Sequence, residues 1–319
     1  MTRGGPLHAP DSRAARRQRR ELREPKQSLD PWRPVAMAWE PELSRDRSWE
    51  PVQTVFLANR ECPFHCTMCD LWKQTLDHPT PLGAIPAQIR VAQSALAPAP
   101  HIKLYNAGNF FDPLAIPPND HTEILELTSD YRTVIVENHP RLCGRRCQEF
   151  CRSCDGRLEV ALGLETVHPT VLASLDKQLT VDVFDRAVDD LLSANASVRA
   201  FVILQLPGLR DEAAVEWAVR SIEHAWARGV DCCSLIPARA GNGWMDQLLA
   251  AGLFEPPRIE LLEATVDRIL ANRARSASPT PRLQVDLWDI EKLSSSTDQR
   301  EEIIARLAHF NQHQAWPDA

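Results

Sequence analysis

Apolar segments alternate with amphipathic ones along most of the chain. The apolar segments have few polar positions on either face, as strands of a buried parallel sheet do, and they lie at 52–59, 101–108, 132–138, 157–165, 198–208 and 230–237. The segments between them predict helices, near 86–96 and 120–129, from Pro169 onward, and before the last strand. That last helix ends at Gly229, and its apolar stripe consists of Val215, Val219, Ile222 and Trp226.

Six strand–helix units in succession predict an α/β fold, a partial (β/α)6 TIM-like barrel with parallel strands. We expect a basic, partly disordered N-terminal extension at 1–50, the barrel core at 51–245, and a C-terminal helical and strand extension at 246–319. Within the last part, 282–290 predicts an edge strand and 298–313 a closing helix.

The composition narrows the class of protein. Of the 319 residues, 44% are hydrophobic, enough for a substantial core, and the net charge of −7 argues against a broadly basic surface for nucleic acid. The exception lies between Met1 and Lys26, where eight basic and three acidic residues predict either a solvated tail or an arm that contacts RNA. No apolar run approaches the ~20 residues that span a bilayer, and no apolar signal segment is present. We therefore expect a cytoplasmic protein with no membrane partner.

Seven of the nine cysteines fall into two tight groups, which indicates metal binding in a reducing compartment rather than a disulfide scaffold. The first group follows the first strand with the spacing C-x3-C-x2-C and consists of Cys62, Cys66 and Cys69. A structural zinc site needs four ligands, so three thiolates favour an iron–sulfur cluster with one iron open to another ligand. A zinc site completed by a residue such as His65 is the alternative.

The second group has four cysteines within twelve residues, namely Cys143, Cys147, Cys151 and Cys154. The first three would share one face of an ideal helix, and the whole group would span about 16 Å at ~1.5 Å per residue. A single metal site cannot bridge that length. An auxiliary Fe–S cluster or a zinc site therefore requires a broken helix or only some of these cysteines, and the alternative is a half-buried cysteine face.

Functional residues of such a barrel lie at the C-terminal ends of its strands. The residues found there, candidates for cofactor binding by position, are Asn106, Ala107, Gly108, Glu137, Glu165, Pro207, Pro237 and Arg239. Arg239 and Asn242 either bind a carboxylate of substrate or cofactor or stabilise a turn. His139 either contacts the cofactor or is a loop residue, and we expect Lys177 to be solvated.

The cysteine spacing and several later motifs resemble the radical S-adenosylmethionine (SAM) superfamily, over roughly residues 52–290. The motifs are YNAGNFFDP at 105–113, GLET at 163–166, LPG at 206–208 and SLIP at 234–237. The resemblance implies that the first three cysteines bind a [4Fe–4S] cluster whose fourth iron chelates SAM. An electron from reduced ferredoxin or flavodoxin would cleave SAM, and a 5′-deoxyadenosyl radical would abstract hydrogen from the substrate.

The resemblance also implies roles for the strand ends. The turn 106–108 would receive the methionine amino group, although the acid usual in this turn is missing here. Glu165 would contact polar groups of the cofactor, and Pro207 and Pro237 belong to the segments that would line adenine. The sequence assigns no catalytic residue.

Within the superfamily, the chain resembles the elongator-like branch and, more narrowly, the radical subunit of archaeosine synthase. The motifs that carry this likeness are CTMCDLW, YNAGNFFDP, VIVENHP, GLETVHP and IPARAGNG. It implies tRNA modification, with a deazaguanine-type base or a nucleoside as substrate. The alternatives are radical SAM chemistry in small-molecule or natural-product biosynthesis, and a non-catalytic zinc-binding interaction protein.

Overall fold

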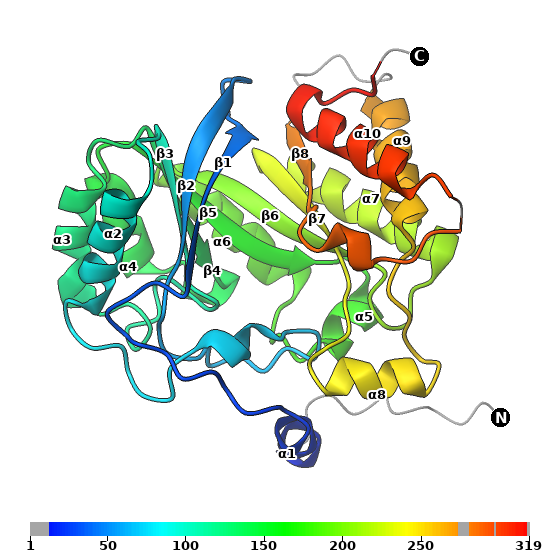
Figure 1. The fold of residues 1–319 in the computed structure, drawn as a ribbon, viewed down its shortest axis with the longest axis horizontal. Helices are drawn as coiled ribbons and strands as arrows, with labels where there is room; N and C mark the ends of the chain where they lie inside the picture. Colours follow the sequence, from blue (N-terminus) through cyan, green and yellow to red (C-terminus); the bar gives the residue numbers. More distant parts are fainter. Residues whose placement is uncertain (1–12, 274–280, 297, 318–319) are drawn as a thin grey trace.

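One curled sheet forms the centre of the computed structural model, which describes residues 13–273, 281–296 and 298–317 (Figure 1). Its strands lie side by side in chain order; β1 is antiparallel to β2, and all later neighbours are parallel. The strands are β1 Ala36–Leu43, β2 Trp49–Phe56, β3 His101–Tyr105, β4 Thr133–Asn138, β5 Arg157–Glu165, β6 Ser197–Leu204, β7 Cys232–Pro237 and β8 Arg282–Val285. The prediction of a partial TIM-like barrel is therefore confirmed.

Helices cover the outer face of this sheet (Figure 1). The α-helices of the described residues are α1 Arg13–Glu21, α2 Ala84–Ala95, α3 His121–Leu127, α4 Arg145–Ser153, α5 Pro169–Ser174, α6 Val181–Ser193, α7 Asp211–Ala227, α8 Trp244–Ala250, α9 Ile259–Arg273 and α10 Arg300–His313. Helices α2, α6 and α7 pack directly on strands. Helix α10 packs on β8 and β1, which are the two edge strands of the sheet. None of these helices is both long and apolar enough to cross a membrane.

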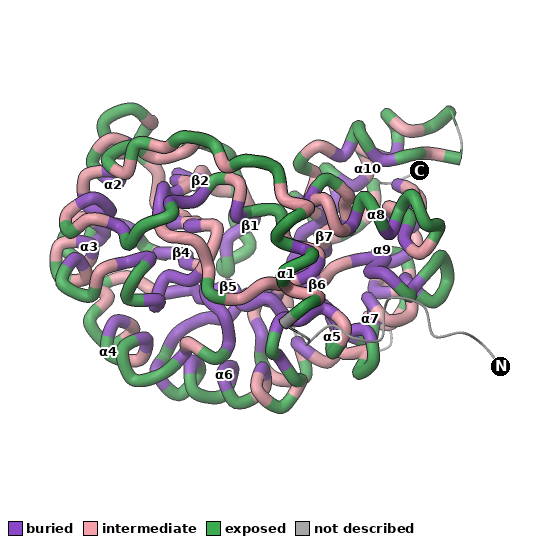
Figure 2. The backbone as a smooth tube through the Cα atoms, turned by 90° about the horizontal axis from the view of Figure 1, so that it is seen from below, coloured by how far each residue is buried: buried purple, intermediate pink, exposed green. Residues whose placement is uncertain are grey.

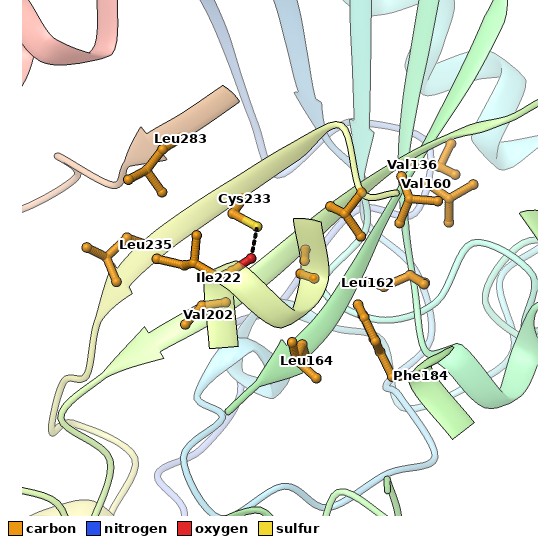
Figure 3. Packing of buried hydrophobic residues seen from close by; sticks show 14 of the residues in the cluster. Val136, Val160, Leu162, Leu164, Phe184, Val202, Ile222, Cys233, Leu235 and Leu283 are labelled. Carbon is orange, nitrogen blue, oxygen red and sulfur yellow. Dashed lines mark hydrogen bonds between the residues drawn. The ribbon is translucent and has the colours of Figure 1, made fainter. Parts of the chain in front are cut away.

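Alternate residues of each strand face the helices, as the two-residue period of a strand requires. Val160, Leu162 and Leu164 of β5 are buried in a core that also contains Phe184 of α6 (Figure 3). The same core includes Leu235 of β7 and extends to residues of α9 and α10. The last third of the chain thus shares one hydrophobic core with the barrel.

The inner face of the sheet carries a buried network of charges. Glu42 of β1 pairs with Lys103 of β3 and with Arg199 of β6. Glu159 of β5 lies 2.7 Å from Arg199 and 2.8 Å from Arg282 of β8. Burial raises the pKa of Glu42, but Arg199 and Lys103 outweigh it and hold this pKa well below its ordinary value. Each buried charge therefore has a partner, without which burial would be costly.

Strand β1 lies in the stretch that we expected to be an extension. Only Leu43 is buried along it, because β1 is an edge strand with solvent on most sides. A strand without a buried face shows no hydrophobic alternation in the sequence. At the other end of the sheet, the expected strand 282–290 ends already at Val285.

Candidate functional site

The three clustered cysteines lie on a loop between β2 and α2, at the C-terminal ends of the parallel strands. All three thiols are free and half-buried. The loop is fixed at both ends and in the middle: Leu76 N donates to Asn59 O at 2.8 Å, and Thr67 N donates to Leu175 O at 2.8 Å. The sequence therefore folds the cysteines into a defined loop at the end of the barrel where activity is expected.

The surroundings of the thiols exclude much of the solvent and include the ammonium group of Lys177. Asn109 Nδ2 lies 3.1 Å from the sulfur of Cys62. Burial raises the pKa of the Cys66 thiol to about 12, against the opposing effect of the Lys177 ammonium group. Burial likewise raises the pKa of Cys69, and the neighbouring Cys66 adds to this shift. The three thiols thus lie close enough to influence one another electrostatically.

Lys177 is buried, so the expectation that it is solvated was wrong. Its ammonium nitrogen lies 2.5 Å from Glu165 Oε1, and the two side chains are only 9% and 7% exposed. Burial lowers the pKa of Lys177, but Glu165 and Cys66 outweigh it and raise this pKa above its ordinary value. A Cβ added at Gly163 would overlap both charged groups, which explains the glycine in the GLET motif.

Three strand ends carry backbone conformations that non-glycine residues rarely adopt. The φ angles are +46° at Ala107 after β3, +66° at Glu165 in β5, and +64° at Gln205 after β6. Each such residue costs on the order of 1–3 kcal/mol, and such strain concentrates at functional sites. Glu165 also lies at an irregularity in the pairing of β5 with β6, which redirects its side chain.

Two asparagines beside the cysteine loop have buried polar atoms without a partner in the described part of the chain. They are Asn106, which lacks a partner for both side-chain polar atoms, and Asn59, which lacks one for Oδ1. A Cβ at Gly108 would lie 3.5 Å from Asn59 Nδ2 and 3.6 Å from Asn106 Nδ2, so all three residues adjoin one another. Since buried polar groups normally have partners, these atoms indicate a place prepared for a ligand.

Glu137 and His139 hold the end of β4 against this turn. A carboxylate oxygen of Glu137 accepts from Asn106 N at 3.2 Å. Burial raises the pKa of Glu137 to about 7, despite hydrogen bonds from the backbone of Asn106 and Ala107. His139 stacks on Phe64 of the cysteine loop at 3.8 Å between ring centroids, and its Nε2 lies 2.9 Å from Lys177 O. His139 therefore connects three loops of the site.

The remaining candidates lie around this centre. Pro237 ends β7, and Pro207 follows β6 in a buried turn. Arg239 donates to Asp286 at 3.2 Å and to Trp288 O, so it connects to the segment after β8. Asn242 Nδ2 donates to Thr67 O at 2.8 Å and to Cys69 O at 3.2 Å, which supports its turn-stabilising alternative. Cofactor binding by Pro207, Pro237 and Arg239 stays a prediction.

The second group of cysteines lies along helix α4 and its two ends, and this helix is unbroken from Arg145 to Ser153. Cys143 and Cys147 are buried in the core, whereas Cys151 and Cys154 are half-buried beside a cavity of about 540 Å³. The sulfur of Cys147 contacts those of Cys143 and Cys151, which strongly raises its pKa. A second metal site here stays a prediction.

The donor atoms of the first group suit an iron–sulfur cluster, although no described group of three or more His, Cys, Asp or Glu side chains is already arranged around a metal position. The three free thiols provide the soft ligands that iron–sulfur clusters use. The adjoining Lys177 ammonium would offset negative charge, and the unpartnered atoms of Asn106 would offer hydrogen bonds to a polar ligand. These residues fit a cluster and a polar cofactor by their chemistry.

Several residues of this site were missed from the sequence. They include Asn59 and Asp176, which lie outside the quoted motifs, and nothing in their residue type or spacing separates them from ordinary loop residues. Asn109 does lie in the quoted motif YNAGNFFDP, which was the available signal.

Known proteins resemble this chain in sequence and in fold. No protein-family model matches the sequence. The curated archaeosine synthase subunit beta of Methanosarcina acetivorans is 27% identical over 201 residues, which are 60% of this chain and 58% of that protein. The chain therefore spans less than two thirds of the length of this relative.

Two solved structures share the fold. Elp3 of Methanocaldococcus infernus, with its N-terminus deleted, matches with a TM-score of 0.50 and 14% identity over 74% of this chain and 64% of that chain. Coproporphyrinogen III oxidase (HemN) of Escherichia coli, a radical SAM enzyme, matches with a TM-score of 0.50 and 12% identity over 83% of this chain and 56% of that chain.

The chain shares its fold with HemN, a radical SAM enzyme, and is similar in sequence to archaeosine synthase subunit beta, in agreement with the predicted resemblance to the radical SAM class. It resembles Elp3 in fold and archaeosine synthase subunit beta in sequence.

Proposed function

We propose that Cys62, Cys66 and Cys69 bind a [4Fe–4S] cluster and that SAM binds beside it at the ends of β3 to β7. The single observation that supports this most is the position of three free thiols next to Lys177 and the unpartnered Asn106. When bound, the cluster and SAM supply one-electron reduction and hydrogen abstraction.

The residues of the chain have distinct tasks in this proposal. Lys177 offsets the negative charge of the thiolates, and Glu165 holds the ammonium group in place. Asn106 and the strained turn at Ala107 present polar atoms to the amino acid part of SAM, and Glu137 fixes this turn. The packed walls of the barrel keep water from the reacting atoms.

The substrate belongs to the same proposal. A deazaguanine-type tRNA base or a nucleoside is favoured, supported by the name of the curated relative. Reduced ferredoxin or flavodoxin would provide the electron. A reducing, cytoplasmic location is supported by the nine cysteines, all of which are free.

Anaerobic reconstitution with iron and sulfide tests the cluster. We expect a brown protein with about four iron atoms per chain, whereas the variant C62A/C66A/C69A should stay colourless. Cys233→Ala, which removes a buried thiol packed near Ile222 of α7, is the matched control and should keep the iron. A colourless wild-type protein that binds zinc instead would contradict the proposal and support the zinc-binding alternative.

A tRNA that carries a deazaguanine base tests the substrate. It should accelerate consumption of SAM by the reconstituted protein, with the same tRNA lacking the modified base as control. Equal rates with both tRNAs would contradict the proposed substrate while leaving the cluster proposal intact.

A further inference from the structure

The described part of the basic N-terminal segment, residues 13–26, packs against the cysteine loop and its neighbours. Arg16 donates to both carboxylate oxygens of Asp176, at 2.8 and 2.6 Å, and Arg19 donates to the same carboxylate. The side chain of Asp176 is 0% exposed and that of Arg19 is 8% exposed. Two arginines of α1, of which Arg19 is buried and Arg16 is 33% exposed, thus meet one buried acid, whose charge would be costly without a partner.

Further contacts extend along the same segment. Arg20 donates to His65 Nε2 at 2.6 Å, within the cysteine motif. Arg23 donates to Glu61 at 2.7 Å, and its guanidinium group lies 4.7 Å from the ring centroid of Trp72. At Gly243, a Cβ would overlap the backbone of Leu22, so the segment also lies directly against the loop after β7.

These contacts place α1 over two of the three thiols. A small cavity has α1 arginines on one side and the cysteine loop on the other, and its lining includes Arg16, Arg19, His65, Cys66 and Cys69. Cys62 does not line this cavity and instead contacts Asn109. Figure 1 shows α1 apart from the sheet, on the side of α5 and α8, and the view from below in Figure 2 shows α1 in front of the strands.

Helix α1 is too short to be stable without contacts to the rest of the chain. It has nine residues, five of them arginine, and an isolated helix shorter than ~12–15 residues is marginal in water. Its position therefore depends on contacts with the rest of the chain, among them the ion pairs of Arg16 and Arg19 with Asp176. This use of the arginines also gives the basic segment a role other than contact with RNA.

We propose that α1 is a cover for Cys66 and Cys69 and that Asp176 is the positioning residue that holds it. Asp176 also precedes Lys177, which reaches Glu165 from the same short loop. The loop thereby couples the cover to the charged pair beside the thiols. The value of such a cover for an oxygen-sensitive cluster rests on the proposed function, but the cover itself can be tested without any cluster.

The test is pulsed alkylation of the reduced, metal-free protein with N-ethylmaleimide, read for each cysteine by mass spectrometry. In R16Q/R19Q, labelling of Cys66 and Cys69 should rise by about tenfold or more relative to Cys62, because loss of the pairs favours local opening. Arg17→Gln changes an exposed arginine of the same helix, which pairs with Glu21, and should leave all rates unchanged. R16K/R19K, which keeps the charges, should restore most of the protection.

Equal labelling of Cys66 and Cys69 in R16Q/R19Q and R17Q would overturn the proposal. If R16Q/R19Q does not fold, Asp176→Asn removes the same pairs from the other side. The wild-type protein provides a further test at urea concentrations below unfolding: Cys66 and Cys69 should become reactive before the buried Cys233. If Cys66, Cys69 and Cys233 became reactive at the same urea concentration, α1 would not open separately, and this result would also overturn the proposal.

Discussion

Replacing Lys177 by methionine should destabilise the metal-free protein severely. The substitution keeps much of the side-chain volume but leaves the Glu165 carboxylate buried without its partner at 2.5 Å. Breaking a buried pair from one side costs about 3–5 kcal/mol, because the remaining charge is uncompensated. Glu165→Gln should cost a similar amount, since it leaves the Lys177 ammonium group unpaired.

The double variant E165Q/K177M distinguishes pairing from packing. It has no buried charge at this position, so its loss of stability should be well below the sum of the two single losses, with a coupling of about 1.5–3 kcal/mol. Lys292→Met is the matched control, because Lys292 pairs with Asp289 at 2.8 Å but is 69% exposed. An exposed pair contributes about 0–1 kcal/mol, so this control should be almost neutral.

Urea unfolding of the reduced apo-protein, followed by circular dichroism at pH 7.5, measures these differences. The reasoning would be refuted if K177M lost no more stability than K292M. Additive losses in the double variant would refute it as well, because they would mean that the two charges do not depend on each other.

Three further predictions concern the candidate site and the α4 cysteines. Gly163→Ala should cost about 1–3 kcal/mol of unfolding free energy by overpacking, because its Cβ would displace Glu165 and Lys177, whereas Gly144→Ala, with open space around it, should cost little in the same urea assay. Burial raises the pKa of Glu137 to about 7, so the folded state binds a proton more tightly than the unfolded state does. Wild-type stability should therefore fall relative to E137Q as the pH rises from about 4.5 to 7, and parallel urea titrations that show no such divergence would exclude this shift. A second metal site that holds zinc at the α4 cysteines predicts zinc in C62A/C66A/C69A by elemental analysis, and a zinc-free triple variant would contradict it.

The sequence was sufficient to predict the strands and helices that bury apolar side chains. The six predicted strands are β2 to β7, because each buries apolar residues in the core and is bounded by turns. The helix expected at 298–313 is α10, Arg300–His313. Edge strand β1 was missed because Leu43 is its only buried residue.

Local motifs found the cysteine loop but not what surrounds it. Lys177 was misplaced because its partner Glu165 is twelve residues away, and a charged residue in a loop is normally solvated. Asp176 and Arg19 meet across 157 residues, a distance at which no periodicity or spacing relates one residue to another. Charge pairs between residues far apart in the sequence could therefore be identified only from the structure.

The most direct test of the central claim is release of 5′-deoxyadenosine from SAM by the reconstituted and reduced protein under anaerobic conditions. The wild-type protein should release it, and Cys66→Ala should not. A wild-type protein that has a reducible cluster but releases no 5′-deoxyadenosine would contradict the account.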